Sequence, residues 1–222
     1  MIEGRMAGEL AAEYLGYTSE AEETKTLKGL DIALDGLRQG MFAPKNWGKN
    51  ITKTEEGIPI STNLLQKGYV TDEEIIRFPG VSEGEAIHPV IECTQNIPCN
   101  PCQDVCPNHC IKVGSNITAL PSLERDSQCL GCGLCVASCP GQAIFLLQEK
   151  KGEGTAEITL PYEFLPLPKV GTKGIALGRN GQKVCDAEVV AVKSLPAFDK
   201  TSLLTMKVPV AYAMKARFFK TV

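Results

Sequence analysis

One run of cysteines carries the clearest chemical signal in this sequence. Residues 129 to 140 read C-x2-C-x2-C-x3-C-P, with the thiols on Cys129, Cys132, Cys135 and Cys139. This is the spacing of thiolate ligands around a cubane iron–sulfur cluster, and the fourth cysteine of such a run ligates a neighbouring cluster. The run therefore predicts a second set of cysteine ligands elsewhere in the chain.

A second run lies upstream and repeats the first. Residues 93 to 107 read C-x5-C-x2-C-x3-C-P, with the thiols on Cys93, Cys99, Cys102 and Cys106. One constant offset aligns the last three cysteines and the proline of the two runs. At that offset Cys110-Ile111 falls on Ala143-Ile144, which predicts that Cys110 is a packing residue and not a ligand.

With these two runs, residues 89 to 148 resemble the two-cluster bacterial-type ferredoxin domain. The resemblance implies two [4Fe-4S] clusters with crossed ligation. One set of ligands would be Cys93, Cys99, Cys102 and Cys139, and the other would be Cys129, Cys132, Cys135 and Cys106. The five residues between Cys93 and Cys99 depart from the commonest pattern of that family, so Cys93 has the least regular position.

Two other metal sites compete with this interpretation. Paired CxxC motifs also bind zinc, but zinc does not require a third cysteine at the same spacing followed by Cys-Pro, and that feature occurs twice here. A single four-thiolate site could be built from Cys99, Cys102, Cys106 and Cys110. Such a site would leave Cys93 unused and would break the repeat.

The elements that position these cysteines are predicted from the residues around them. A short helix should follow each Cys-Pro, with proline in its first turn, and residues 111–114 and 144–147 should form strands. The glycines Gly131, Gly133 and Gly141 expose amides that can donate to cluster sulfurs. An apolar shell is expected from Ile97, Val105, Ile111, Leu130, Val136 and Ile144.

The fold class predicted for the whole chain is α+β. Residues 1–40 should form a helical segment, and residues 41–88 an extended linker or docking arm, with Trp47 and Phe78-Pro79-Gly80-Val81 as candidate contact points. Residues 89–150 form the ferredoxin-like module. Residues 151–222 are predicted to form a small antiparallel, barrel-like β domain. Its strands should be 156–160, 173–177, 183–192 and 203–210, with a hairpin turn at Asn180-Gly181 and a helix over 211–219.

Composition limits the class of protein. The chain has 222 residues, ten cysteines and a net charge of −3, so it lacks the basic surface that nucleic-acid binding requires. The chain contains no run of 18 apolar residues, so no membrane-spanning helix is predicted. Because cubane clusters are assembled where thiols stay reduced, we expect a cytoplasmic protein.

Electron transfer is the function that these features predict. Eight cysteine ligands would saturate both clusters, and neither His88 nor His109 belongs to a catalytic signature, so no catalytic residue is predicted. The layout of residues 91–102 with the later Cys-Pro-Gly-Gln-Ala-Ile is similar to ferredoxin-like subunits of FAD-dependent proline- or sarcosine-type dehydrogenase complexes. This implies a hetero-oligomer with flavoprotein subunits that carry the FAD. The alternatives are a binding module with structural clusters and a substrate-binding subunit of an oxidoreductase.

Overall fold

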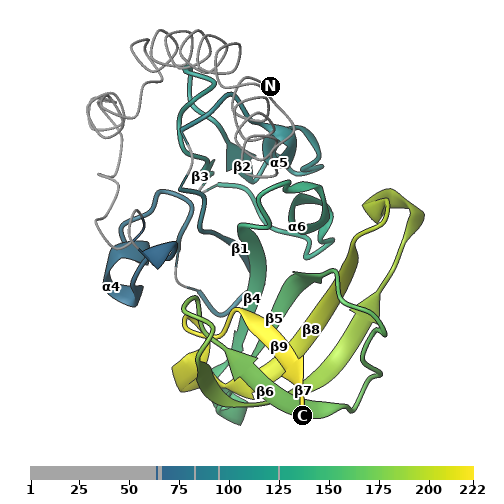
Figure 1. Ribbon diagram of the computed structural model, residues 1–222. Helices are drawn as coiled ribbons and strands as arrows, with labels where there is room; N and C mark the ends of the chain where they lie inside the picture. The colour runs from purple at the N-terminus through teal and green to yellow at the C-terminus, as the bar shows by residue number, and fades with distance from the viewer. Residues whose placement is uncertain (1–63, 65–66, 83, 95, 125) are drawn as a thin grey trace, which may run out of the picture. The chain divides into compact units, whose positions relative to one another are not determined.

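The computed structural model describes residues 64, 67–82, 84–94, 96–124 and 126–222 (Figure 1). The predicted helical segment 1–40 and the greater part of the predicted arm, including Trp47, lie outside these residues. The described chain contains three short α-helices, α4 (Asp72–Ile75), α5 (Pro101–Asp104) and α6 (Leu134–Ser138). In this part of the chain, no helix has the length and apolar character needed to cross a bilayer.

A seven-stranded sheet is the largest element of the fold. Its strands, in spatial order, are β1 (His88–Ile91), β4 (Ile144–Lys150), β5 (Thr155–Tyr162), β8 (Ser202–Pro209), β7 (Lys183–Lys193), β6 (Lys173–Leu177) and β9 (Phe218–Thr221). Every neighbouring pair is antiparallel. The described structure therefore has mixed helix and sheet content, and its large sheet is antiparallel throughout. A separate two-stranded ladder joins β2 (Ile111–Lys112) to β3 (Ser122–Leu123).

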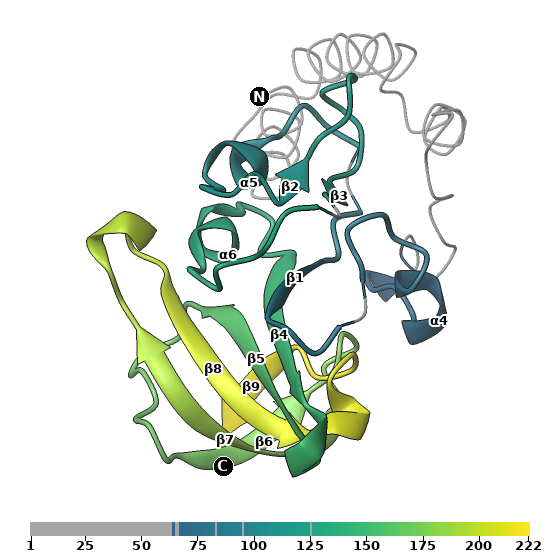
Figure 2. The ribbon, with the colours of Figure 1, turned by 180° about the vertical axis from the view of Figure 1, so that it is seen from behind.

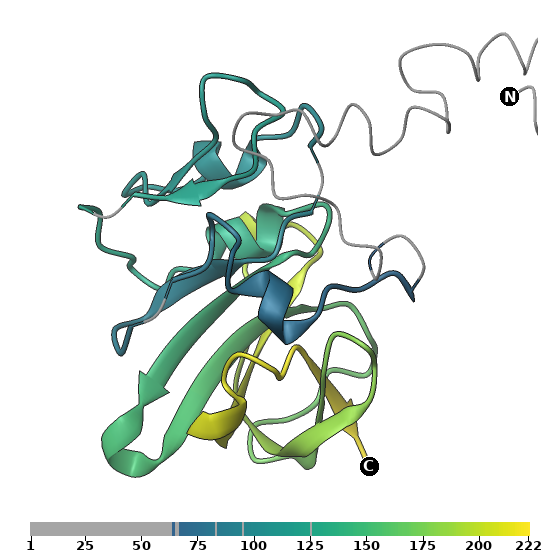
Figure 3. The ribbon, with the colours of Figure 1, turned by 90° about the vertical axis from the view of Figure 1, so that its left-hand side faces the viewer.

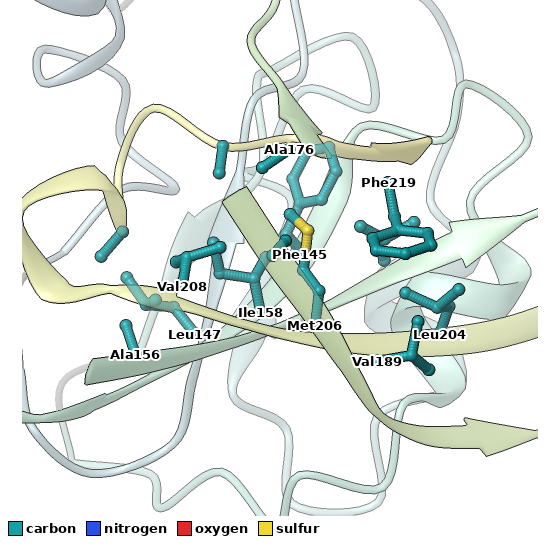
Figure 4. Close-up of a cluster of buried hydrophobic side chains, with 14 of the residues drawn as sticks. Phe145, Leu147, Ala156, Ile158, Ala176, Val189, Leu204, Met206, Val208 and Phe219 are labelled. Atoms are coloured by element: carbon teal, nitrogen blue, oxygen red, sulfur yellow. The ribbon is translucent and has the colours of Figure 1, made fainter. Parts of the chain in front are cut away.

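The sheet is strongly curled, as Figures 1 and 3 show, and it closes over one apolar core. Its two edge strands both contribute to that core, through Val90 of β1 and Phe219 of β9. In β5 every second side chain from Ala156 to Leu160 is buried, as the two-residue period of a strand requires. Figure 4 shows this core, with Phe145 and Met206 among its side chains.

The four strands predicted after residue 150 are present as β5, β6, β7 and β8, with small shifts at their ends. The hairpin turn at Asn180-Gly181 is also present: Gly178 N donates to Gln182 O at 2.9 Å, and β6 pairs with β7. The predicted helix over residues 211–219 is wrong. A single 3-10 turn, η4 (Val210–Tyr212), is followed by β9, which pairs with β6.

The sheet runs through the predicted boundary at residue 150. β4, from the ferredoxin-like segment, pairs with β5 beyond it, and the connection is the 3-10 turn η2 (Lys151–Glu153). A third 3-10 turn, η3 (Pro196–Phe198), precedes β8. Phe198 and Leu203 pack in the core that surrounds the cysteines. The C-terminal strands therefore form part of the environment of the thiols.

The described end of the predicted arm packs against the rest of the chain. Val70, Ile75 and Phe78 form a small buried cluster, and α4 begins with a capping box in which Thr71 N donates to the Glu74 side chain at 2.7 Å. Gly80 lies so close to β1 that a Cβ atom there would be 2.5 Å from the Cβ atom of Ile91. The Phe78–Val81 segment thus has a local packing role.

Candidate functional site: two groups of cysteines

The described structure brings nine of the ten cysteines into two groups. The pKa of Cys102 is raised to about 11, chiefly by burial and then by the neighbouring thiols of Cys139, Cys93 and Cys99. The pKa of Cys135 is raised to about 12, again chiefly by burial, with contributions from Cys129, Cys132 and Cys106. Apart from Cys110, which also lies in the second group, these groups have the members of the two ligand sets implied by the ferredoxin resemblance. Their role as ligands stays a prediction.

The second group surrounds a small cavity. Five cysteines line it, namely Cys106, Cys110, Cys129, Cys132 and Cys135, together with Gly133 and residues of β2 and β4. Cys106 ends the first cysteine run and Cys110 follows it, whereas the other three come from the second run, so the two runs meet in space. Thiols around one cavity are the donors that iron–sulfur clusters use, and four of these five, without the predicted packing residue Cys110, would fit such a group.

The two cysteine runs share a backbone conformation as well as a spacing. They are related by 33 residues, the separation of Cys106 and Cys139. At that offset α5 aligns with α6, and β2 aligns with the start of β4. His109 and Gln142, also 33 residues apart, both have a left-handed backbone, with φ of 51° and 50°. The internal repeat is therefore structural.

Strand pairing is crossed between the two halves of this repeat. β1, before the first run, pairs with β4, after the second run. β3, before the second run, pairs with β2, after the first run. Just beyond these ladders, Glu92 N donates to Ala143 O at 2.8 Å and Glu124 N donates to Cys110 O at 2.9 Å. Each half thus supplies the partner strand of the other, which brings the two runs together (Figure 2).

The helices lie inside the cysteine runs and not after them. The structure shows turns at Pro107 and Pro140, so the predicted helix after each Cys-Pro is wrong. Instead α5 carries Cys102 and α6 carries Cys135. The proline in a first helical turn is Pro101, where its missing N–H costs no hydrogen bond.

Backbone amides donate to three of the thiols. Gly131 N donates to Cys129 Sγ at 3.3 Å, whereas the sequence predicted that the amide of this glycine would donate to a cluster sulfur. Two further donors were not predicted: Cys110 N lies 3.2 Å from Cys106 Sγ, and Ala143 N lies 3.4 Å from Cys139 Sγ. These two bonds occupy equivalent positions of the repeat. Because amide donors stabilise thiolate charge, they favour the ionised form that binds iron and influence the potential of a bound cluster.

The apolar shell around the thiols was predicted in part. Ile111, Val136 and Ile144 are each at most 1% exposed and belong to the core that includes Cys102 and Cys135. Val105 is partly buried against the same core. Ile97 and Leu130 are instead exposed, at 48% and 62%, because their loops turn outward. Phe198 and Leu203 complete the shell, and local sequence around the cysteines gives no signal for them.

Two cysteines remain outside the predicted ligand sets. Cys110 is 4% exposed and lines the cavity of the second group, and burial raises its pKa to about 11. Cys185 lies in β7, half-buried against the main core, and burial is the largest cause of its raised pKa. Both positions suit small apolar side chains.

Among the described residues, no three His, Cys, Asp or Glu side chains converge closely enough to hold a single metal ion. His88 lies at the start of β1, where Nδ1 is 2.8 Å from Ala86 O, and His109 is in the turn after Cys106. Neither histidine lines the cavity of the second group.

Comparison with known proteins agrees with the second cysteine run. A family model described as a 4Fe-4S binding domain matches residues 125–145, which contain Cys129, Cys132, Cys135 and Cys139. No curated protein and no solved structure matches the chain. The match implies a 4Fe-4S cluster in this part of the chain, and it supports an iron–sulfur electron-transfer role for the protein.

Proposed function

We propose that this chain is an electron-transfer subunit that holds two [4Fe-4S] clusters. It relays single electrons between an FAD-containing dehydrogenase subunit and another redox carrier in a multi-subunit oxidoreductase. The observation that supports this proposal best is that thiols of both cysteine runs lie together, with Cys106 beside Cys129, Cys132 and Cys135 and with Cys139 near Cys93 and Cys102.

The pseudo-symmetry of the two runs supports the count of two clusters. The family match covers only the second run. The first run repeats its helix, its left-handed residue and its amide-to-thiol bond at a constant offset. A segment that reproduces the backbone of a cluster-binding loop, with the same thiol types, is suited to the same ligand.

The residues of this chain would hold the clusters and control their surroundings. A 4Fe-4S cluster, when bound, accepts and donates one electron at a time. Cys102 and Cys135 would anchor one cluster each from the two helices, in the apolar core. Cys132 is exposed and Leu130, two residues before it, is 62% exposed, so solvent reaches the second group of cysteines through the loop that contains these two residues. An external redox partner would approach the second group at this loop.

Metal analysis with electron paramagnetic resonance tests the two-cluster proposal. Anaerobically purified protein should contain about eight iron atoms per chain, four for each cubane, and both clusters should be reversibly reducible. Cys106→Ala should lose a cluster, whereas Cys110→Ala, the matched control in the same cavity, should lose none. Zinc, a single cluster, or clusters that cannot be reduced would overturn the proposal.

Purification under gentle anaerobic conditions tests the flavin partnership. The proposal rests on the similarity of the cysteine layout to ferredoxin-like subunits of FAD-dependent dehydrogenases. A tagged chain should co-purify with flavin-binding chains, and reduction of their flavin should be followed by reduction of its clusters. Isolation as a flavin-free monomer from its native source would contradict this part of the proposal and would leave the cluster assignment intact.

A further inference from the structure

A buried charge network begins one residue before Cys93. Glu92 follows the edge strand β1, and Arg217 precedes the opposite edge strand β9. Arg179 reaches the same place from the turn between β6 and β7. The three side chains are only 6% to 8% exposed. They therefore join the two edges of the curled sheet at the point where the chain enters the first cysteine run.

The geometry of this network is specific. Arg179 grips the Glu92 carboxylate with two bonds, Nε to Oε2 at 2.8 Å and Nη2 to Oε1 at 2.5 Å. Arg217 Nε donates to the same Oε1 at 2.5 Å, and its guanidinium lies 5.1 Å from the centre of the Phe145 ring. Bidentate contacts of this kind fix orientation as well as distance. The side chain of Glu92, and with it the backbone leading to Cys93, is held rigidly.

Further bonds hold the two arginines. Arg179 donates to Asp72 Oδ1 at 2.6 Å and to Met214 O at 2.8 Å. Arg217 donates to the carbonyl oxygens of Ala213 and Ala216. Two guanidinium groups and one carboxylate leave one net positive charge in the buried part of the network. Asp72, whose side chain is 46% exposed, lies at the rim, where solvent screens its charge.

The second half of the repeat has a matching residue without such a network. Glu124 N donates to Cys110 O, just as Glu92 N donates to Ala143 O, and Cys110 and Ala143 are equivalent positions of the repeat. Its side chain is 43% exposed and forms an ion pair with Lys112 at 3.6 Å, where Lys112 is 63% exposed. Water and salt screen a pair of this kind strongly. The buried network therefore lies next to Cys93, whereas Glu124, five residues before Cys129, belongs to a solvent-exposed ion pair.

We propose that Glu92, Arg179 and Arg217 position Cys93, and that the net positive charge of these three groups raises the reduction potential of the cluster that Cys93 would ligate. This inference rests on the proposed two-cluster function. The five-residue gap after Cys93 leaves that cysteine less constrained by its own loop than Cys129, so an anchor at the preceding residue supplies the missing constraint. A buried positive charge also stabilises the additional electron of a reduced cluster, because the low dielectric of the interior screens it weakly.

Potentiometric titration followed by electron paramagnetic resonance tests the effect on potential. Cys93→Ser in a parallel sample identifies which signal belongs to the Cys93 cluster. Glu92→Gln keeps the shape of the side chain and removes its negative charge, so the potential of that cluster should rise by more than that of the other. Glu124→Gln is the matched control and should move neither potential by a comparable amount.

Iron content tests the positioning role. Arg179→Gln removes the bidentate contact with Glu92, and gel filtration should then yield protein with about four iron atoms in place of about eight, with the Cys93 cluster lost first.

A second variant covers the case in which Glu92→Gln does not fold. Asp72→Asn changes the charge of the same network at its half-exposed edge and should give a smaller rise in the potential of the Cys93 cluster. Equal shifts in both clusters, no shift, or equal loss of both clusters would overturn the inference. A wild-type protein without two clusters would instead overturn the proposed function.

Discussion

The two halves of the cysteine repeat share a backbone but differ in how the fold supports them. The strand after the second run, β4, has seven residues and pairs with both β1 and β5 in the large sheet. The corresponding strand after the first run, β2, has two residues and pairs with β3. Glu92, one residue before the first run, is buried with two arginines, whereas Glu124, five residues before the second run, has a side chain that is 43% exposed. The two cysteine runs thus share a local backbone conformation, but different contacts support each of them.

This difference indicates that the cysteine-containing loops and the contacts that support them are separate parts of the structure. The spacing of the last three cysteines, the helix position and the amide-to-thiol bonds repeat, as the proposed ligation of one cluster by each group would require. The supporting contacts do not repeat, because each half meets a different part of the sheet. Substitutions in the supports should therefore have unequal effects on the two halves.

The largest effect is expected from breaking the buried network. Arg179→Ala leaves the carboxylate of Glu92 with Arg217 as its remaining ion-pair partner, and removing one partner of a buried ion pair costs about 3 to 5 kcal/mol. The apparent melting temperature, measured anaerobically on the cluster-loaded protein, should fall by roughly 10 °C. A fall of only a degree or two would mean that the network contributes little to stability.

A somewhat smaller effect is expected at the start of α6. Gly133 has a φ of 86°, and a Cβ atom there would lie 2.4 Å from Leu203 Cδ1. Gly133→Ala should destabilise the protein by about 2 to 4 kcal/mol through backbone strain and overpacking. Gly141→Ala is the control, because no atom lies within 4 Å of the added methyl group. Melting curves of the two variants should separate clearly, and coincident curves would contradict the packing described here.

The equivalent isoleucines of the two halves allow a direct comparison. Ile111 and Ile144 are both 1% exposed, one in the short ladder and one in the large sheet. Removal of one methyl group by Ile→Val typically costs about 0.5 to 1.5 kcal/mol. We expect Ile144→Val near the top of that range and Ile111→Val near the bottom, because a two-stranded ladder can relax into the space. Hydrogen exchange should agree, with β2 amides exchanging faster than β4 amides; the reverse order would count against unequal support.

The smallest effect is expected at the exposed ion pair of the second half. Lys112→Ala removes the partner of Glu124, and exposed pairs of this kind contribute about 0 to 1 kcal/mol. The melting temperature should change by a degree or two at most, and added salt should abolish the difference from wild type. A fall in melting temperature as large as that expected for Arg179→Ala would show that exposure does not predict how much the ion pairs of Glu92 and Glu124 contribute to stability.

Much of the local structure could be predicted from local sequence. The strands after residue 150 followed from alternating apolar residues and the Asn180-Gly181 turn, because both signals act over a few residues. The helix predicted over residues 211–219 failed for a reason outside its own sequence: Phe218 and Phe219 pair with Leu177 and Ala176 of β6, which fills an open sheet edge. The helix of the first cysteine run was misplaced because proline can begin a helix at Pro101 as well as after a Cys-Pro, and the helix of the second run begins after Gly133 without a proline.

The sequence by itself indicated which thiols to consider, since the two spaced runs and their internal repeat are written along the chain, and the ferredoxin resemblance implied how to divide them. The structure brings the members of each set near one another, and ligation stays a prediction. Only the tertiary structure decided that Glu92 meets Arg179 and Arg217, which are 87 and 125 residues away. It also decided that β1 and β4 belong to the same sheet as the C-terminal strands. Contacts between residues so far apart in the sequence depend on how the sheet curls and closes, and a local pattern of residues cannot predict this.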